Sequence, residues 1–282
     1  KNFGFTPPQE HGYHVVDAIK AMHEGKGKVF FAMGGNFLSA TPDTDFTAEA
    51  LRKTELTVHV STKLNRSHLI HGQEALIFPC LGRMDDDHQE SGEQFVTVEN
   101  SMGVVHPSTG GLPPASEHLL SEPAIIVGLA NATLKDSKTD WNRFIEHYDH
   151  IRDAIDKTVD GFENYNVRVR EPGGFYLPNG ARDGDFKTDT GKANFSVNEI
   201  ADHNLSEGDY LMMTVRSHDQ YNTTIYGLDD RYRGIYNGRR IVMMNPDDME
   251  AVGVKEGDFV DLSSNYEGVE RLAPKFFVVA YD

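Results

Sequence analysis

The sequence contains a single cysteine, Cys80, among its 282 residues. One cysteine cannot form a disulfide within the chain, and alone it cannot hold a structural zinc ion or an iron–sulfur cluster. A nucleophilic thiol would need an activating base, and no Cys–His arrangement can be located in the sequence. We therefore expect no metal site and no thiol catalysis in this chain, and the lack of disulfides favours a cytoplasmic protein.

Long apolar runs are also missing, and so is a signal peptide. No stretch approaches the roughly 18 consecutive apolar residues of a membrane-spanning helix. No charged segment followed by an apolar one opens the chain. We therefore expect no membrane partner. The sequence begins at Lys1 instead of a methionine, so we expect the natural N-terminus to lie upstream.

Positive charge is scarce. Lysine and arginine number 27 against 44 aspartates and glutamates, which gives a formal net charge of −17. Such a surface repels nucleic acid backbones and anionic lipids, so no nucleic acid partner is expected. A phosphate-bearing ligand is compatible with this charge where backbone amides and a few local cations hold it. The sequence contains neither a G-x-G-x-x-G fingerprint nor a Walker motif.

The first part of the chain alternates between helical and strand-like segments. Helical spacing of apolar residues covers 15–24, and a second helix is predicted from about Pro42 to Lys53, with Thr41 as its N-cap. A short apolar run, typical of a strand buried in a parallel sheet, occupies most of 28–33, and further strands are predicted at 56–60 and 75–78. This alternation predicts a parallel sheet with right-handed crossovers.

The rest of the chain changes character twice. The predicted elements up to residue 206 are irregular loops over 82–117 with short strands at 94–98 and 104–106, helices over 117–134 and 141–159, and then a connection. The predicted elements after it are strands at 210–215, 240–244, 259–263 and 275–280, with a helix that begins after Asn245 and stops at Gly253. Clustered strands around one short helix predict a barrel.

Two segments that follow strands have the composition of ligand-binding loops. Paired glycines in Gly34-Gly35-Asn36 allow a ligand to approach the backbone closely, because no Cβ obstructs it. The polar run from Ser61 to His68 offers hydroxyls, cations and an amide that suit phosphate and ribose. An ordinary tight turn and a capped helix start would explain the same residues. Because ligands bind beyond the carboxyl ends of strands in open α/β sheets, the two loops support each other.

A third polar segment runs from Thr214 to Thr223. Arg216 could pair with an anion through two hydrogen bonds, and His218 could donate to a heterocycle or a phosphate. A hydrogen-bonded surface loop is the alternative. The run from Asp85 to His88 has metal-ligand residue types, but four adjacent residues rarely converge on one ion, so we expect a solvated acidic loop.

At this point the segments resemble one family, the molybdopterin oxidoreductases, and within it the YdeP-like branch related to the formate dehydrogenase alpha subunit. The stretches that carry the resemblance are KVFFAMGGNFLSATPDT, LTVHVSTKLNRSHLI, ALIFPCLGR, GEQFVTVENSMGVVHPS, LLSEPAIIVGLA, TVRSHDQYNTTIYGLDDRYRGI and RIVMMNPDDMEAVGVKEGDFVDL. They occur in the family's order and cover most of the chain.

The resemblance implies a fold and a cofactor. It places an α/β Rossmann-like parallel-sheet domain at 1–136, a helical and irregular connection at 137–206, and a mainly β double-psi barrel at 207–282. Members bind two molybdopterin guanine dinucleotides around one molybdenum. The residues that correspond to cofactor-binding positions are Gly34, Gly35, Asn36, Ser61, Thr62, Lys63, Asn65, Glu99, Asn100, Thr214, Arg216, Ser217, His218 and Asn222.

The resemblance also implies what this chain does not carry. In the family, the molybdenum ligand and any iron–sulfur cysteines lie upstream of the matching region, and relatives continue beyond the final VVAYD. We therefore expect the upstream region of the same polypeptide as a partner, a small-molecule substrate of the formate class for the whole enzyme, and no turnover by this chain alone. No catalytic acid or base can be named.

A second hypothesis comes from another functional class, because double-psi barrels also serve in recognition. The chain would then be a non-catalytic nucleotide-binding or adaptor module. The cofactor hypothesis requires one ligand surface shared by the Gly34, Ser61 and Arg216 loops, whereas the adaptor hypothesis does not.

Overall fold

The structure is a computed structural model that describes residues 3–218, 220–221 and 225–282. The chain divides into two compact units, Lys1–Ile200 (unit 1) and Ala201–Asp282 (unit 2). No helix in the described part of the chain is both long and apolar enough to cross a bilayer.

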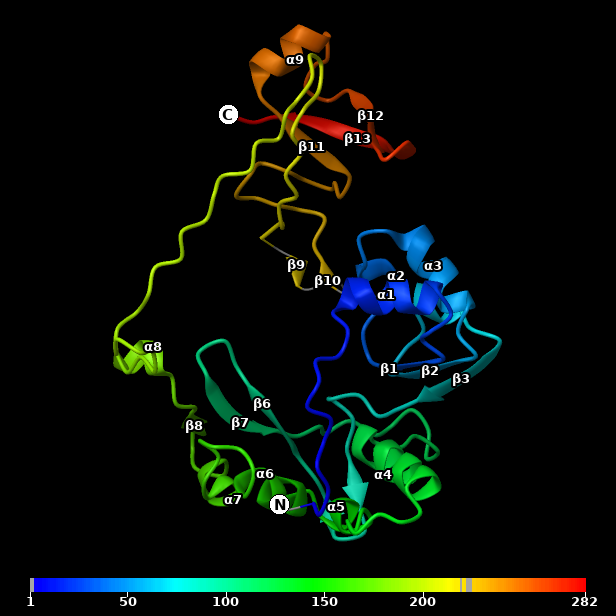
Figure 1. Cartoon of the computed structure of the whole chain (residues 1–282), viewed down its shortest axis with the longest axis vertical. Helices are drawn as coiled ribbons and strands as arrows, with labels where there is room; N and C mark the ends of the chain where they lie inside the picture. The colour runs from blue at the N-terminus through cyan, green and yellow to red at the C-terminus, as the bar shows by residue number, and fades with distance from the viewer. Residues whose placement is uncertain (1–2, 219, 222–224) are drawn as a thin grey trace. The chain divides into compact units, whose positions relative to one another are not determined.

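A three-stranded parallel sheet forms the first half of unit 1 (Figure 1). Its strands are β1 (Val29–Met33), β2 (Leu56–Ser61) and β3 (Glu74–Pro79), with β2 in the centre. In register, Phe31 lies opposite Val58, and Val58 lies opposite Leu76. The three strands expected from the sequence are therefore present and parallel. Whether the domain as a whole is Rossmann-like stays a prediction.

Three helices cover one face of this sheet (Figure 1). They are α1 (Val15–His23), α2 (Phe37–Ala40) and α3 (Thr44–Arg52), followed by a single 3-10 turn, η1 (Arg66–Leu69). Leu51 of α3 is fully buried, and it shares a hydrophobic core with Ile19 and Met22 of α1 and Leu38 of α2. Helix α3 begins two residues later than predicted, because Asp43 is its N-cap and accepts from the Phe46 N–H at 3.0 Å.

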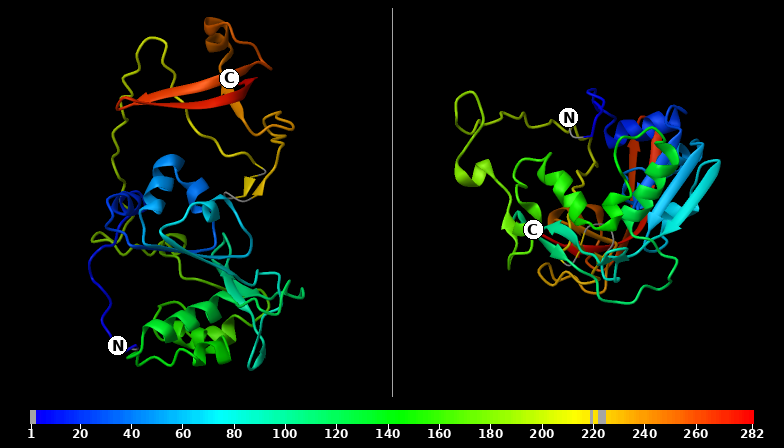
Figure 2. Two further views of the ribbon diagram at one scale, coloured as in Figure 1. Left: turned by 90° about the vertical axis from the view of Figure 1, so that its right-hand side faces the viewer. Right: turned by 90° about the horizontal axis from the view of Figure 1, so that it is seen from below.

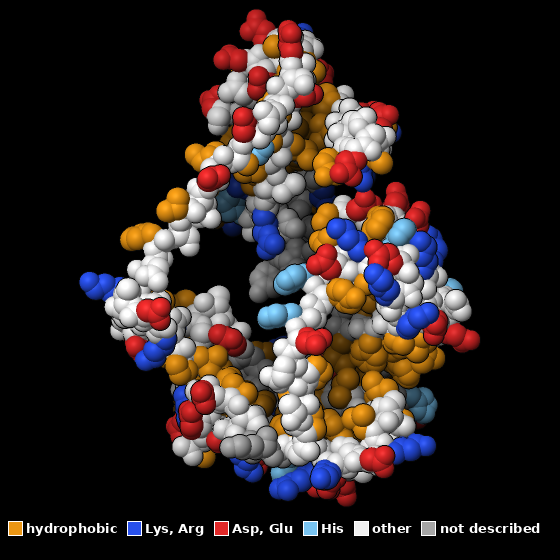
Figure 3. Space-filling model, viewed as in Figure 1, with side chains coloured by type: hydrophobic (Ala, Val, Ile, Leu, Met, Phe, Trp, Pro, Cys, Tyr) orange, Lys and Arg blue, Asp and Glu red, His pale blue; other side chains and the backbone are white. Residues whose placement is uncertain are grey.

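The opposite face of the sheet carries exposed apolar side chains. Residues Val29, Phe31 and Met33 of β1 and Leu76 and Phe78 of β3 are all more than a third exposed. Figure 3 shows hydrophobic side chains gathered beneath the three helices, where the sheet lies. Parallel sheets are usually covered on both faces. On this face the side chains of the edge strands are partly exposed, whereas Val58 and Val60 of the central strand are buried.

The second half of unit 1 consists of small sheets and short helices. The strands are β4 (His88–Gln89), β5 (Gly92–Glu93), β6 (Val96–Glu99), β7 (Val104–Ser108) and β8 (Phe175–Tyr176). The helices are α4 (Glu122–Thr133), α5 (Arg143–Glu146), α6 (Asp149–Asp156), α7 (Tyr165–Arg168) and α8 (Gly180–Asp183). Strands β6, β7 and β8 form one antiparallel sheet, whose core contains Val105, Tyr165, Val169 and Phe175.

Two predicted helices of this region are wrong in extent. Helix α4 begins at Glu122 instead of 117, because Ser121 caps it and Pro123 stands in its first turn. The helix predicted over 141–159 is two helices, separated by His147 in an extended conformation. Tyr148 explains the break. Its backbone N–H donates to the Gln94 side chain at 2.9 Å, which a continuous helix would not allow.

Arg152 on α6 is a buried side chain that bonds to several elements in the second half of unit 1. It is only 3% exposed. Its guanidinium donates to the Phe95 carbonyl at 3.0 Å and to the Asn166 side chain at 2.7 Å, and it pairs with Asp149. The same group lies 4.0 Å above the Phe95 ring. One side chain therefore links the chain before β6 to α6 and α7.

Unit 2 is mainly β with one helix. Its elements are β9 (Gln220–Tyr221), β10 (Ile225–Tyr226), β11 (Ile241–Met244), α9 (Pro246–Val252), β12 (Phe259–Tyr266) and β13 (Val269–Ala280). Strand β13 pairs in parallel with β11 and antiparallel with β12, and Figure 2 shows the long β12–β13 hairpin. The described strands form a two-stranded and a three-stranded sheet without closing into a barrel, so the double-psi barrel stays a prediction.

In unit 2, the sequence correctly predicts the ends of α9 but not the segment at 210–215. Asn245 caps α9 by accepting from the Asp247 N–H at 2.9 Å, Pro246 opens the helix, and Gly253 ends it with a φ of 72°, as predicted. The strand predicted over 210–215 is wrong, because this segment has no ladder partner and is exposed. Its apolar residues occur in a run without an adjacent strand to pair with.

Candidate functional site

The loops that follow β1 and β2 are joined at the carboxyl end of the sheet. The Gly34 N–H donates to the Val60 carbonyl at 2.7 Å. The Asn65 side-chain Nδ2 donates to the Gly35 carbonyl at 2.8 Å. The two loops that the sequence singled out separately therefore lie against each other, as expected for neighbouring parallel strands.

The Gly34-Gly35 turn leaves open space above its backbone. Both glycines have left-handed φ angles, 69° for Gly34 and 73° for Gly35. A Cβ built on either residue would meet no atom of the protein within 4 Å. The Gly34 N–H is already bonded to Val60, so the Gly35 backbone is the part of this turn that a ligand could approach, and a side chain there would fill that space.

The second loop is organised by residues that the sequence analysis did not select. The Ser67 hydroxyl accepts from the Leu38 N–H at 3.0 Å, which ties η1 to the first turn of α2. His68 Nδ1 accepts from the Asn65 N–H at 3.0 Å, while His68 Nε2 lies 3.2 Å from the Ser61 hydroxyl. The sequence signal was a capping box, an asparagine followed three residues later by a side chain that can accept from it.

These contacts change the interpretation of Asn65. Its Oδ1 accepts from the Ser67 N–H at 2.9 Å, and its Nδ2 donates to Gly35. The side chain predicted to touch a cofactor therefore bonds the two loops to each other. Among the other predicted residues of this loop, Ser61 is 8% exposed, whereas Thr62 and Lys63 are exposed. Lys63 makes no ion pair with another described residue.

A buried histidine lies beneath this loop. His59 on β2 is 3% exposed, and its Nε2 has no hydrogen-bond partner within the described part of the chain. Burial lowers the pKa of His59, and the nearby His68, with ring centroids 4.7 Å apart, lowers it further. His59 is therefore neutral at neutral pH and packs as a core aromatic.

Glu99 and Asn100 lie on a different sheet, at the turn between β6 and β7. The Asn100 Oδ1 accepts from the Met102 N–H at 2.9 Å and from the Val104 N–H at 3.2 Å. Asn100 therefore stabilises its own hairpin. Glu99 is exposed at the end of β6.

In unit 2, the segment around Arg216 is held by a turn that follows β10. The Asp230 carboxylate, 3% exposed, lies 3.0 Å from His218 Nδ1 and accepts from Arg233 Nη1 at 2.6 Å. Arg233 Nη1 also donates to the Arg216 carbonyl at 3.3 Å. Burial alone would raise the pKa of Asp230, but hydrogen bonds from Arg233 and His218 outweigh it and keep the pKa below its usual value. The Tyr232 ring packs against His218 in a tilted arrangement, with ring centroids 4.5 Å apart.

The remaining predicted residues of this segment differ in their surroundings. The Arg216 side chain is exposed, and so is Thr214. Ser217 lines a cavity of about 200 Å³ together with Asp230 and Arg233. Asn222 lies outside the described residues. Sequence reasoning missed Asp230 and Arg233, although the motif DDRYR stood next to the chosen segment.

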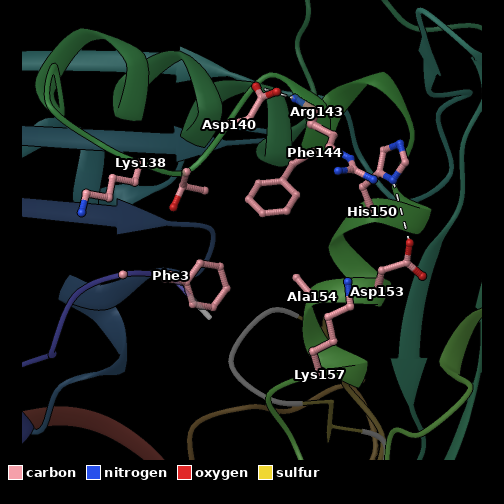
Figure 4. Close-up of a pocket in the computed structure, with 11 residues that line it drawn as sticks. Phe3, Lys138, Asp140, Arg143, Phe144, His150, Asp153, Ala154 and Lys157 are labelled. Carbon is pink, nitrogen blue, oxygen red and sulfur yellow. Dashed lines mark hydrogen bonds and ion pairs between the residues drawn. The ribbon is translucent and has the colours of Figure 1, made fainter. Parts of the chain in front are cut away.

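Other candidates in unit 1 have ordinary explanations. A cavity of about 450 Å³ between the chain start and helices α5 and α6 contains no predicted site residue. Figure 4 shows that its charges are mixed, with His150 facing Asp153 at 3.9 Å and Asp140 beside Arg143. Burial raises the pKa of Cys80, so its thiol is rarely ionised.

The acidic run at 85–88 is not one metal centre. Asp85 accepts from the Gly82 N–H at 2.6 Å, Asp86 pairs with His88 at 3.2 Å, and Asp87 accepts from the buried Tyr148 hydroxyl at 2.6 Å. The three carboxylates therefore have three separate partners. The expectation of a solvated loop holds only in part, because Asp87 joins a buried network.

Comparison with known proteins gives consistent matches. Residues 210–273 match the Molydopterin dinucleotide binding domain. The chain is 52% identical over 288 residues to an "uncharacterized oxidoreductase" of Mycobacterium tuberculosis strain H37Rv, with 100% of this chain and 37% of that protein aligned. It is 44% identical over 265 residues to YdeP of Escherichia coli K12, with 93% of this chain and 35% of YdeP aligned.

The chain therefore spans a little over a third of the length of the curated relatives it matches. The match to the dinucleotide-binding domain includes the Arg216 segment and the Asp230 turn that organises it. On these matches the chain belongs to the molybdopterin oxidoreductase family, on the branch that includes YdeP.

Proposed function

We propose that this chain holds a molybdopterin guanine dinucleotide within a larger oxidoreductase. The observation that carries the proposal is the open space above Gly34 and Gly35, where no protein atom lies within 4 Å of a built Cβ. The loop that Asn65 joins to this turn also carries the Ser61 hydroxyl and the exposed Lys63. Backbone amides, a hydroxyl and a cation suit the diphosphate of a dinucleotide.

The charge of the chain makes local cations important to this proposal. A formal net charge of −17 opposes the approach of a diphosphate. Lys63 in unit 1 and Arg216 in unit 2 are exposed cations at the predicted positions. We propose that Lys63 in unit 1 and Arg216 in unit 2 each contact phosphate oxygens.

The chemistry proposed for the whole protein is an oxidation or reduction of a small molecule of the formate class. When bound, molybdenum would supply the two-electron exchange with that substrate. The residues of this chain would bind and orient the cofactor and set the charge around its phosphates. None of them is assigned to proton transfer.

Arg216→Ala tests the proposal in the full-length protein. A charge-assisted hydrogen bond contributes about 1.5–3 kcal/mol, so loss of the guanidinium should weaken cofactor binding roughly 10- to 150-fold. Molybdopterin released per polypeptide, measured by pterin fluorescence after extraction, reports the loss.

Lys26→Ala is the control, because Lys26 is an exposed cation that pairs with Glu24 at 2.6 Å and lies outside the predicted loops. Arg216→Lys, which keeps the charge but not the two-pronged geometry, should lie between wild type and alanine. Equal cofactor content in the Arg216→Ala and Lys26→Ala proteins would contradict a phosphate contact by Arg216.

A further inference from the structure

The hydrogen bonds around His68 determine which of its ring nitrogens carries the proton. The Asn65 N–H can only donate, and it points at His68 Nδ1 at 3.0 Å. The Asn65 carbonyl, 3.2 Å from the same nitrogen, already accepts from the His68 backbone N–H at 3.1 Å. Nδ1 therefore acts as the acceptor, and in the neutral ring the hydrogen sits on Nε2.

This assignment fixes the role of the Ser61 hydroxyl. His68 Nε2 lies 3.2 Å from the Ser61 Oγ, so the ring donates and the serine oxygen accepts. A hydroxyl has one hydrogen of its own to donate. No acceptor for that hydrogen is found among the described residues around Ser61. The serine therefore has a hydrogen left to donate, in the loop that Asn65 joins to the Gly34-Gly35 turn.

His68 also acts on the glycine turn through Asn65. The ring accepts from the Asn65 backbone, and the Asn65 amide donates to the Gly35 carbonyl at 2.8 Å. The histidine itself is partly buried and is held against His59, with ring centroids 4.7 Å apart. Burial lowers the pKa of His59, so the His59 ring adds no positive charge beside His68.

We propose that His68 is a positioning residue that presents the Ser61 hydroxyl as a hydrogen-bond donor, so that the ligand atom bound at Ser61 is an acceptor, such as a phosphate oxygen. This inference rests on the proposed cofactor-binding function and adds to it the atom that the second loop recognises.

The test is a double-mutant cycle in the cofactor-free full-length protein, with guanosine diphosphate as the probe and its Kd measured by titration calorimetry. Ser61→Ala should weaken binding roughly tenfold or more, as expected for a lost hydrogen bond to a charged oxygen. His68→Phe should weaken binding by a similar factor. In the Ser61→Ala background, His68→Phe should have little further effect, because its action passes through the serine.

A conservative variant separates positioning from folding. Gln at position 68 can accept from the Asn65 N–H through Oε1 and donate to Ser61 through Nε2, so His68→Gln should restore most of the affinity. Thermal unfolding of each variant checks that the protein tested is folded.

The outcomes distinguish the proposed phosphate contact of Ser61 from the proposed positioning role of His68. If Ser61→Ala leaves the Kd for guanosine diphosphate unchanged, the proposed phosphate contact of this loop is wrong. If Ser61→Ala weakens binding but the effects of Ser61→Ala and His68→Phe simply add, the loop binds phosphate and the positioning role of His68 is wrong. Failure of His68→Gln to restore binding in a folded protein would also overturn the role of His68.

Discussion

Gly35→Ala is expected to remove most of the bound cofactor from the full-length protein while lowering its stability only slightly. The left-handed φ of 73° costs an alanine about 1–2 kcal/mol. No protein atom lies within 4 Å of the added methyl group, so no clash inside the chain adds to this cost. The methyl group would, however, occupy the space that the proposed ligand needs. Cofactor content by pterin fluorescence and the midpoint of urea unfolding measure the two effects separately.

Gly25 offers a matched control for this substitution. It follows α1, has the same φ of 73°, and also has no atom within 4 Å of a built Cβ. Gly25→Ala should therefore show the same small loss of stability and retain its cofactor. Equal cofactor content in the two variants would mean that no ligand approaches the Gly34-Gly35 turn.

Arg152→Met is expected to give a large loss of stability in unit 1. The substitution keeps the packing of an unbranched chain but leaves the Phe95 carbonyl without its Arg152 donor, and Asn166 Oδ1 keeps only the longer hydrogen bond from Arg170 at 3.4 Å. Removing one partner of a buried ion pair typically costs about 3–5 kcal/mol. The lower end is expected here, because Asp149 keeps a second partner in Arg170 at 2.8 Å.

Urea unfolding of the 282-residue chain measures this effect, with Arg143→Met as the control. Arg143 is exposed and its guanidinium lies at the rim of the mixed-charge cavity of Figure 4, so its replacement should change the stability by less than about 0.5 kcal/mol. A similar small change for Arg152→Met would mean that the linkage between α6, α7 and the chain before β6 is not what stabilises unit 1.

The elements that the sequence predicted well are those with local causes. Strand β1 follows from the uninterrupted apolar run Val29–Met33, and α9 follows from Asn245, Pro246 and Gly253 at its ends. The errors arose where contacts distant in sequence decide the structure. The break between α5 and α6 depends on Gln94, more than fifty residues away, and the run at 210–215 is not a strand because no neighbour pairs with it.

In the candidate site, too, some features could be predicted from the sequence and others could not. Strand-end glycines and polar residues were recognisable, because parallel strands bring their carboxyl ends to one edge. His68 and Asp230 were not selected, since each acts through another residue: His68 on Ser61, and Asp230 on His218. Asn65 was selected for the correct loop but for a different role, because its amide bonds to Gly35. Sequence alone identifies which loops matter better than it identifies what each side chain contacts.

The most direct test of the account is the cofactor content of the wild-type full-length protein, produced in cells that make the molybdenum cofactor. Metal analysis gives molybdenum per polypeptide, and mass spectrometry of the extracted material identifies the pterin and its nucleotide. The account predicts that molybdenum and a molybdopterin guanine dinucleotide are released together from the folded protein. A folded protein that contains neither, while a known molybdenum enzyme from the same cells is loaded, would contradict it and favour a non-catalytic nucleotide-binding or adaptor module.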